Sequence, residues 1–295
     1  MPPARSGLLH PVHKGVLYAS AGVFVFSLLN VLLKETLRAY PVNEVIFFRN
    51  FFALLPLAGI VLLRRGAMRP RPSPRLPMHL LRAMIGLCAM ALLFRSFQML
   101  PLADATALSF AQPLFLTALS VPLLGQRVGP RRWAAVVVGF IGVLIMLRPG
   151  SDIFRAAAVY GLGAALFMAL AFVTVYRLKR TESSLSIIFH FALISTVLSA
   201  LSLPFSWTMP SGADLFLLML LGLCGALGQF LLTQSFQYAP AAVIGPFNYM
   251  SIVWAVIFGY LLWGEVPAPA VLLGGVVVIA SGLYIVYRET RNRPA

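Results

Sequence analysis

Charged residues are scarce in this sequence. Only 11% of its 295 residues are Asp, Glu, Lys or Arg, against a usual share of about a quarter, and only 8 of them are acidic. So few charges cannot build a water-facing surface of ordinary composition. Apolar residues make up 60% of the chain and the mean hydropathy is +0.90. We therefore expect most of the surface to face the lipid bilayer.

Cysteine is nearly absent as well. Cys88 and Cys224 both fall in apolar segments, without a CxxC pair or a histidine at metal-ligand spacing, so neither a zinc site nor a disulfide framework is expected. The sequence also lacks a glycine-rich phosphate loop, a GxSxG nucleophile turn and an HExxH pair. We expect no metal, no cofactor and no ATP-driven pumping within this chain, and we do not expect an enzyme.

Long apolar runs separated by short gaps fill the chain. A membrane-spanning helix needs about 17 to 25 mostly apolar residues. The gaps contain Pro and Gly and are too short for a soluble domain. The pattern predicts an all-α membrane protein of ten transmembrane helices, at residues 15–35, 43–63, 79–99, 103–124, 131–147, 156–176, 185–206, 213–236, 241–262 and 268–287.

The formal net charge of +15 would suit a nucleic-acid partner, but the basic residues sit in the short gaps. Seventeen of the 23 Lys and Arg residues fall on the side of the two termini, and four fall on the other side. Arg49 and Arg95 lie within spans. Basic loops remain in the cytoplasm, so we predict a multi-pass protein of the bacterial inner (cytoplasmic) membrane with both termini cytoplasmic, and no nucleic-acid partner.

The two halves of the chain repeat one another. The tripeptide Ser-Phe-Gln at 96–98 recurs at 235–237, and Gly125 matches Gly264 at the same spacing, which we call the repeat offset. Each half then holds five spans, an odd number, so the second half must be inserted in the opposite orientation. Inverted repeats are typical of secondary transporters, which bind their substrates near the membrane midplane between the repeats.

The repeat divides the chain into 1–150, a first five-helix repeat, and 151–295, a second and inverted one. Their motifs resemble the EamA-type ten-helix members of the drug/metabolite transporter superfamily. The stretches that carry the resemblance are 81–105, 123–125, 133–150 and 240–265, and the similarity spans essentially the whole chain. The family often has Gly-Glu after both the fourth and the ninth helix; here the first copy reads Gly125-Gln126.

The resemblance implies a central cavity, alternating access and the export of amino acids, including aromatic ones, or the movement of other metabolites. Amino-acid export by a monomer is our expected function. Two other functions stay open. A membrane-embedded enzyme would need clustered catalytic residues at one face, which the four histidines hardly supply. A passive channel is the other alternative, because inverted repeats occur there too.

Polar side chains in the fourth and ninth predicted spans share one face. The repeat offset pairs Ser109 with Asn248 and Gln112 with Ser251. Polar residues in a span usually face a bundle interior or a wet cavity, so these four are predicted to bind substrate; the alternative is helix–helix hydrogen bonding of about 1 kcal/mol each. Trp254 shares this face and is expected to stack on an aromatic substrate, or else to pack.

Two arginines inside spans have two interpretations. Arg49 and Arg95 either reach the membrane surface or pair with an acidic residue, for which Glu44 and Asp104 are candidates. Alternatively they bind a substrate carboxylate, because the planar guanidinium offers two parallel donors.

His190 lies near the terminal-side end of the seventh predicted span. A histidine can change charge near neutral pH, so His190 is a candidate for proton coupling, with a hydrogen-bonded packing role as the alternative. Gln229 on the eighth span is a weaker candidate for the cavity. No carboxylate lies in the middle of any predicted span, which favours a neutral, zwitterionic or anionic substrate over a cationic one.

Overall fold

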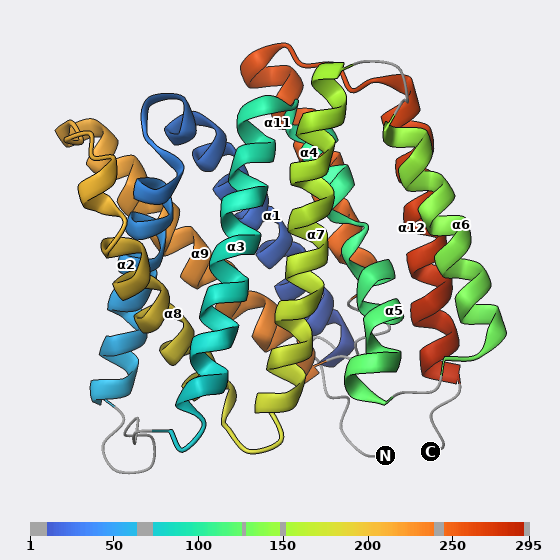
Figure 1. Cartoon of the computed structure of the whole chain (residues 1–295), viewed down its shortest axis with the longest axis horizontal. Helices are drawn as coiled ribbons and strands as arrows, with labels where there is room; N and C mark the ends of the chain where they lie inside the picture. Colours follow the sequence, from blue (N-terminus) through green and yellow to red (C-terminus); the bar gives the residue numbers. More distant parts are fainter. Residues whose placement is uncertain (1–10, 64–72, 126–127, 148–151, 239–244, 292–295) are drawn as a thin grey trace, which may run out of the picture.

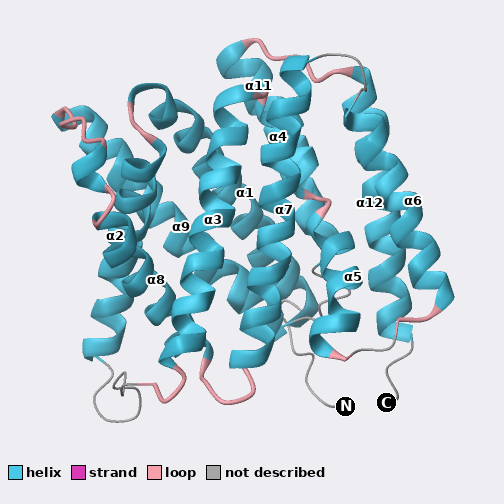
Figure 2. Ribbon diagram, viewed as in Figure 1, coloured by secondary structure: helices cyan, strands magenta, loops and turns pink. Residues whose placement is uncertain are grey.

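A computed structural model describes residues 11–63, 73–125, 128–147, 152–238 and 245–291 of the chain. Across these residues all regular structure is helical, with no strand (Figure 2). The elements are α1 (Pro11–Ala39), α2 (Val42–Leu63), α3 (Leu76–Met99), α4 (Leu102–Ser109), α5 (Gln112–Leu124), α6 (Pro130–Leu147), α7 (Asp152–Leu178), α8 (Ser184–Ala200), η1 (Leu203–Phe205), α9 (Gly212–Tyr238), η2 (Gly245–Tyr249), α11 (Met250–Trp263) and α12 (Pro269–Arg291).

The helices account for the ten predicted spans. Seven segments are long and apolar enough to cross a membrane, and one of them, Leu102–Leu124, contains both α4 and α5. The other three spans are the shorter apolar helices Trp133–Met146, Phe247–Trp263 and Pro269–Tyr284. The prediction of an all-α, ten-helix membrane protein is therefore confirmed, while residues 241–244 of the ninth predicted span lie outside the described residues.

The two halves run in opposite directions. Helix α1 begins and α12 ends at one face of the bundle, which we call the terminal face (Figure 1). Helix α5 ends at this terminal face, whereas its counterpart α11 ends at the opposite face (Figure 1). Both ends are closed by a glycine with positive φ, 65° at Gly125 and 64° at Gly264. Glycine suits this left-handed cap because it has no Cβ. The same glycine cap occurs once in each repeat.

Helix packing follows the repeat. Helix α1 packs on α9 and α3 packs on α7, and exchanging the halves converts one pair into the other. The pairs α2–α8 and α6–α12 are each formed by one helix and its own counterpart. In the α6–α12 pair, a Cβ on Gly142 would lie 2.9 Å from the carbonyl oxygen of Gly274. Small residues permit such close helix contact in lipid.

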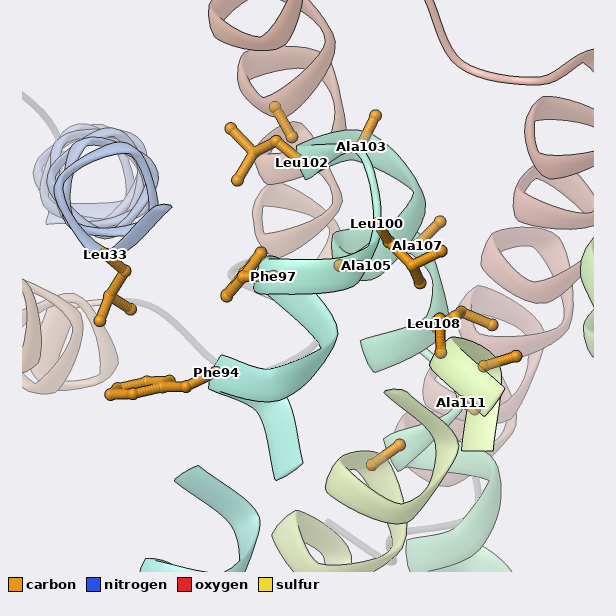
Figure 3. Close-up of a cluster of buried hydrophobic side chains, with 14 of the residues drawn as sticks. Leu33, Phe94, Phe97, Leu100, Leu102, Ala103, Ala105, Ala107, Leu108 and Ala111 are labelled. Carbon is orange, nitrogen blue, oxygen red and sulfur yellow. The ribbon is translucent and has the colours of Figure 1, made fainter. Parts of the chain in front are cut away.

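A buried apolar cluster surrounds α4, where it meets α1 and the end of α3 (Figure 3). Leu33, Phe94, Phe97, Leu102 and Leu108 each expose no more than 2% of their surface. The whole stretch from Leu102 to Leu108 is buried. Helix α4 thus lies inside the bundle, and the kink that follows it is positioned between the two halves.

Candidate functional site

The fourth span is interrupted at Phe110 and Ala111, between α4 and α5. The amides of both residues donate to carbonyls three residues earlier, at 3.1 Å each, which tightens the chain locally. Pro113 adds to the interruption, because proline has no amide hydrogen to donate four residues back. The other half has a matching irregularity, since the 3-10 segment η2 precedes α11.

The two interruptions contact each other. Phe110 and Tyr249 correspond to one another by the repeat offset, and their ring centroids lie 5.0 Å apart. Ser109 and Asn248 directly precede these two aromatic residues in the chain, and Ser109 Oγ donates to the carbonyl of Thr106 at 2.6 Å. Three of the four predicted side chains are half-buried and Asn248 is exposed. The four side chains predicted to bind substrate are those of Ser109, Gln112, Asn248 and Ser251.

Two further predicted residues lie on neighbouring helices. Trp254 of α11 is half-buried, with its ring 4.9 Å from that of Phe24 on α1 and 5.8 Å from that of Phe258. It therefore belongs to an aromatic cluster between α1 and α11. Gln229 is exposed on α9, and its carbonyl accepts a hydrogen bond from Thr233 at 2.7 Å.

The two candidate arginines have different surroundings. Arg95 is exposed near the end of α3 and donates to Gln98 Oε1 at 3.0 Å. Arg49 is half-buried about two turns inside α2, and its Nη1 lies 3.5 Å from Asn50 Oδ1 and 3.6 Å from Met90 Sδ. The distance to the Asn50 oxygen is long for an N–H···O hydrogen bond. Among the described residues, no carboxylate oxygen lies within 4.0 Å of the Arg49 guanidinium.

A third arginine was not predicted as a site residue. The sequence placed Arg82 among the basic residues that set topology, yet α3 begins early enough to carry it almost two turns inside the span. Its guanidinium carbon lies 4.2 Å from the centroid of the Phe191 ring on α8. Its Nε and Nη1 atoms are buried and have no hydrogen-bond partner in the described part of the chain.

Arg49 and Arg82 both belong to the first repeat, but each lies against one member of a repeat-related pair of glycines. A Cβ on Gly225 of α9 would lie 3.8 Å from Arg49 Nη2, and a Cβ on Gly86 of α3 would lie 2.5 Å from Arg82 Nη1. These two glycines are separated by the repeat offset. The two contacts differ, because Arg49 reaches Gly225 from another helix, whereas Arg82 lies one turn before Gly86 on α3 itself. The repeat offset pairs Arg82 with Leu221, so the repeat gave no signal for this arginine.

At the opposite face, an ion pair joins the two halves. Glu265, just after α11, pairs through Oε1 with Lys34 of α1, which is only 7% exposed. Its Oε2 accepts the amide of Leu102 at 2.9 Å and so caps α4, where a negative charge is stabilising. We call this the Lys34–Glu265 lock. Its counterpart in the other half, Gln126, lies outside the described residues.

A second set of contacts at the opposite face joins the start of α2 to the segment between α8 and α9. We call it the opposite-face joint. Tyr40 donates to Asp214 Oδ2 at 2.7 Å, and the backbone amide of Thr208 donates to Glu44 Oε2 at 3.0 Å. The amide of Asn43 donates to the carbonyl of Ser202 at 3.1 Å, and its Oδ1 accepts from the Ser206 hydroxyl at 2.8 Å.

The terminal face has a corresponding joint between the start of α3 and the segment between α7 and α8. We call it the terminal-face joint. His190 is buried, with Nδ1 2.9 Å from the carbonyl oxygen of Ser186. Its ring stacks on that of His79, with centroids 4.4 Å apart and planes at 27°. His79 Nε2 lies 3.9 Å from Glu182 Oε1, which accepts from Ser73, while Oε2 accepts from Ser186 at 2.9 Å.

Comparison with known proteins agrees with this architecture. The chain matches the EamA-like transporter family over residues 13–148 and again over 155–288. It is similar to a solved crystal structure at 15% identity, with a TM-score of 0.64 over 95% of this chain and 99% of that one, which supports the fold.

Three curated relatives are transporters. The chain is 30% identical to a pseudopaline exporter of Pseudomonas aeruginosa, covering 93% of this chain and 96% of that protein. It is 30% identical to an S-adenosylmethionine uptake transporter of Rickettsia felis, covering 92% and 93%. It is 32% identical to a riboflavin transporter of Rhizobium johnstonii, covering 94% and 92%. A multi-pass membrane protein that moves small molecules, and not an enzyme, is what these matches indicate: the chain belongs to the EamA-like transporter family.

Proposed function

We propose that this transporter moves a small metabolite that carries a carboxylate, and that Arg49 binds the carboxylate. The observation that carries the proposal is a guanidinium between α2, α3 and α9 whose polar contacts among the described residues are an amide oxygen and a sulfur. An arginine at this depth is costly without an anionic partner. A substrate carboxylate would supply that partner through two parallel hydrogen bonds.

Arg82 is proposed as the second anion ligand. It enters from the terminal face as Arg49 enters from the opposite face, and both lie against glycines related by the repeat. Inverted repeats exchange their conformations when access alternates between the two sides. A carboxylate would therefore bind Arg49 in one state and Arg82 in the other.

The substrate class that fits best is amino acids and their derivatives, as zwitterions or anions. S-adenosylmethionine, which one relative takes up, is an amino-acid derivative that carries a carboxylate, although its sulfonium makes it a net cation. The polar side chains at the two interruptions are proposed to bind the rest of the substrate, and Trp254 is proposed to stack on an aromatic or apolar part of it. Arg95 and Gln229 remain weaker candidates, because both are exposed.

The orientation remains a proposal as well. The excess of basic residues on the side of the termini supports a cytoplasmic terminal face in the inner membrane. A cysteine at position 181, which is exposed at the terminal face, in a cysteine-free background, should be unreactive to an impermeant reagent added outside intact cells. Labelling there would reverse the orientation.

Uptake into liposomes tests the role of Arg49. Purified protein is first screened by thermal shift against amino acids, S-adenosylmethionine, organic acids and riboflavin, since a ligand of the folded state raises its apparent stability. For a carboxylate substrate, Arg49→Gln should lower kcat/KM by about 10- to 100-fold, the range for a lost charged hydrogen bond. Arg49→Lys should recover only part, because lysine lacks the fork.

Arg131→Gln is the control and should leave uptake nearly unchanged, since this arginine is exposed at the start of α6 and has no proposed role in binding. Riboflavin, which lacks a carboxylate, should be insensitive to Arg49→Gln if it is moved at all. Equal loss of riboflavin and carboxylate uptake would make Arg49 a structural residue. Saturable counterflow would separate a transporter from a passive channel.

A further inference from the structure

The terminal-face joint places titratable groups of both halves in contact. His79 belongs to α3 of the first half, whereas Glu182 and His190 come from the second half. His79 is 1% exposed and His190 is 8% exposed. The family resemblance gives no role to these residues, and the anion-binding arginines do not need them. The contact between His79, His190 and Glu182 is therefore not explained by substrate binding at the arginines.

His79 has the features of a proton acceptor. Both of its ring nitrogens are buried and lack a hydrogen-bond partner within the described residues. Its Nε2 faces a carboxylate oxygen of Glu182 at 3.9 Å. A buried neutral imidazole with no partner is poorly satisfied, whereas a protonated one would form an ion pair with Glu182.

The stacked pair has room for one positive charge. With ring centroids 4.4 Å apart, two imidazolium ions would repel strongly. Among the described residues, the charged groups that face His79 are His190 from α8 and Glu182 from the α7–α8 segment. Arg82, one turn along α3, directs its guanidinium to Phe191 instead. One proton shared by the pair and balanced by Glu182 is the arrangement that leaves no excess charge.

Glu182 is ready to balance that proton at neutral pH. The hydrogen bond from Ser73, together with that from Ser186 and the charge of the neighbouring histidines, holds the pKa of Glu182 below its usual value. Its carboxylate is therefore ionised throughout the range in which histidine titrates.

We propose that His79, His190 and Glu182 form a proton-binding site that couples this transporter to proton movement. A proton from water binds a ring nitrogen of His79, and the resulting imidazolium pairs with Glu182 across the boundary between the two halves. Protonation thereby closes the terminal face, and release of the proton to water loosens it. The inference depends on the protein being a transporter but not on the role of Arg49.

Nitrogen-15 NMR of histidine-labelled protein in lipid nanodiscs tests proton binding directly and needs no substrate. His79→Gln and His190→Gln identify the signals of the pair. The pair should take up one proton between pH 8 and pH 5, and Glu182→Gln should lower the titration midpoint by about one pH unit. His13→Gln, at an exposed position of α1, is the control and should leave the pair unchanged. A pair that does not titrate in this range, or that ignores Glu182→Gln, would overturn the site.

Double electron–electron resonance, which measures distances between spin labels, tests whether protonation is coupled to closing of the terminal face. In a background with Cys88 and Cys224 replaced by alanine, spin labels at positions 77 and 181 report the terminal-face joint, where both native residues are exposed. Labels at positions 39 and 209, also exposed, report the opposite face. From pH 8.0 to pH 5.5 the first distance should shorten and the second should lengthen.

Glu182→Gln should abolish both distance changes. Arg49→Gln should leave them intact, so failure of the carboxylate proposal and failure of the proton proposal give different results. Distances independent of pH, or a change of the same sign at both faces, would show that the histidine pair is only a packing contact.

Discussion

The two joints occupy equivalent places in the inverted repeat but differ in chemistry. By the repeat offset, Glu182 in the terminal-face joint corresponds to Asn43 in the opposite-face joint, and Leu218 corresponds to His79. Where one face has an imidazole beside a carboxylate, the other has a buried leucine and a neutral amide. The repeat thus supplies one backbone design twice with different side chains. The proposed proton-binding histidine has a leucine as its counterpart, while the opposite-face joint holds the buried carboxylate of Glu44.

The Lys34–Glu265 lock adds a fixed charge pair to the opposite face. It ties α1 and α4 of the first half to the end of α11 in the second half. The sequence offers a glutamine, Gln126, at the corresponding position of the first half. Glutamine cannot form an ion pair, so this position of the first half cannot form a charged lock of this kind.

The largest expected effect comes from removing the lock. Glu265→Ala leaves Lys34 buried without its carboxylate and removes the cap of α4, so the free energy of unfolding should fall by about 3 kcal/mol. Unfolding in mixed micelles measures the change. Lys34→Met should cost less, because Glu265 keeps its hydrogen bond with Leu102. If Glu265→Ala matches Lys34→Met within error, the pair is not what stabilises this face.

The next largest effect is expected at the two glycine caps, which test whether the two faces have the same backbone conformation. Gly125→Ala and Gly264→Ala each place a Cβ in open space at positive φ, so only backbone strain of about 1 to 2 kcal/mol is introduced. The two variants should lose the same unfolding free energy, measured side by side. Unequal losses would mean that the caps are not equivalent.

A smaller effect on stability is expected when His79 and Glu182 of the terminal-face joint are replaced by the residues that correspond to them in the other half. His79→Leu with Glu182→Asn should remove the dependence of stability on pH between 5.5 and 8.0 that the proposed proton-binding site confers. The lowered pKa of Glu182 contributes nothing in this window, because its stabilisation is lost only below about pH 4.5.

Unfolding at several pH values in that window measures the double variant. Asn43→Ala, a loss of hydrogen bonds at the opposite-face joint, provides the control, since its cost should be the same at every pH. A wild-type protein whose stability does not differ between the two pH values would contradict the proposed asymmetry.

The smallest expected effect concerns Tyr40. Its hydrogen bond to Asp214 raises the pKa of the phenol, so the stabilisation is complete below about pH 10 and declines only as pH rises through the higher folded value. Tyr40→Phe should therefore lower the melting temperature equally at pH 5.5 and pH 8.0. A loss that varies between these values would show a titrating group at the opposite-face joint.

The fold was largely predictable from the sequence, because hydropathy and the repeat offset act over long segments. The ten spans, the inverted halves and the matching glycines at 125 and 264 are all visible in the residue order. The division of the fourth span into α4 and α5 was not predicted. Pro113 indicated an irregularity, but the kink also depends on the packing of Phe110 against Tyr249.

The site was less predictable. Arg49 and His190 were singled out because each lies inside an apolar run, and their proposed roles stay predictions. Lys34, His79, Arg82 and Glu182 were missed, because residues near the ends of predicted spans resemble ordinary flanking polar and charged groups. Helix α1 extends to Ala39, four residues beyond the predicted end, so Lys34 is buried rather than exposed. The burial of a side chain depends on which helices pack against it, and this packing cannot be read from the sequence of one helix alone.

The Lys34–Glu265 lock also constrains the order of events during synthesis. Its partners are separated by 231 residues, and chains grow at about 5 to 20 residues per second. Lys34 therefore enters the membrane roughly 10 to 50 seconds before Glu265 exists. Throughout that interval the first helix carries a cation without its final counter-ion, so Lys34 must stay near water or within the insertion machinery. The newborn first half is expected to remain loosely assembled until the ninth helix arrives.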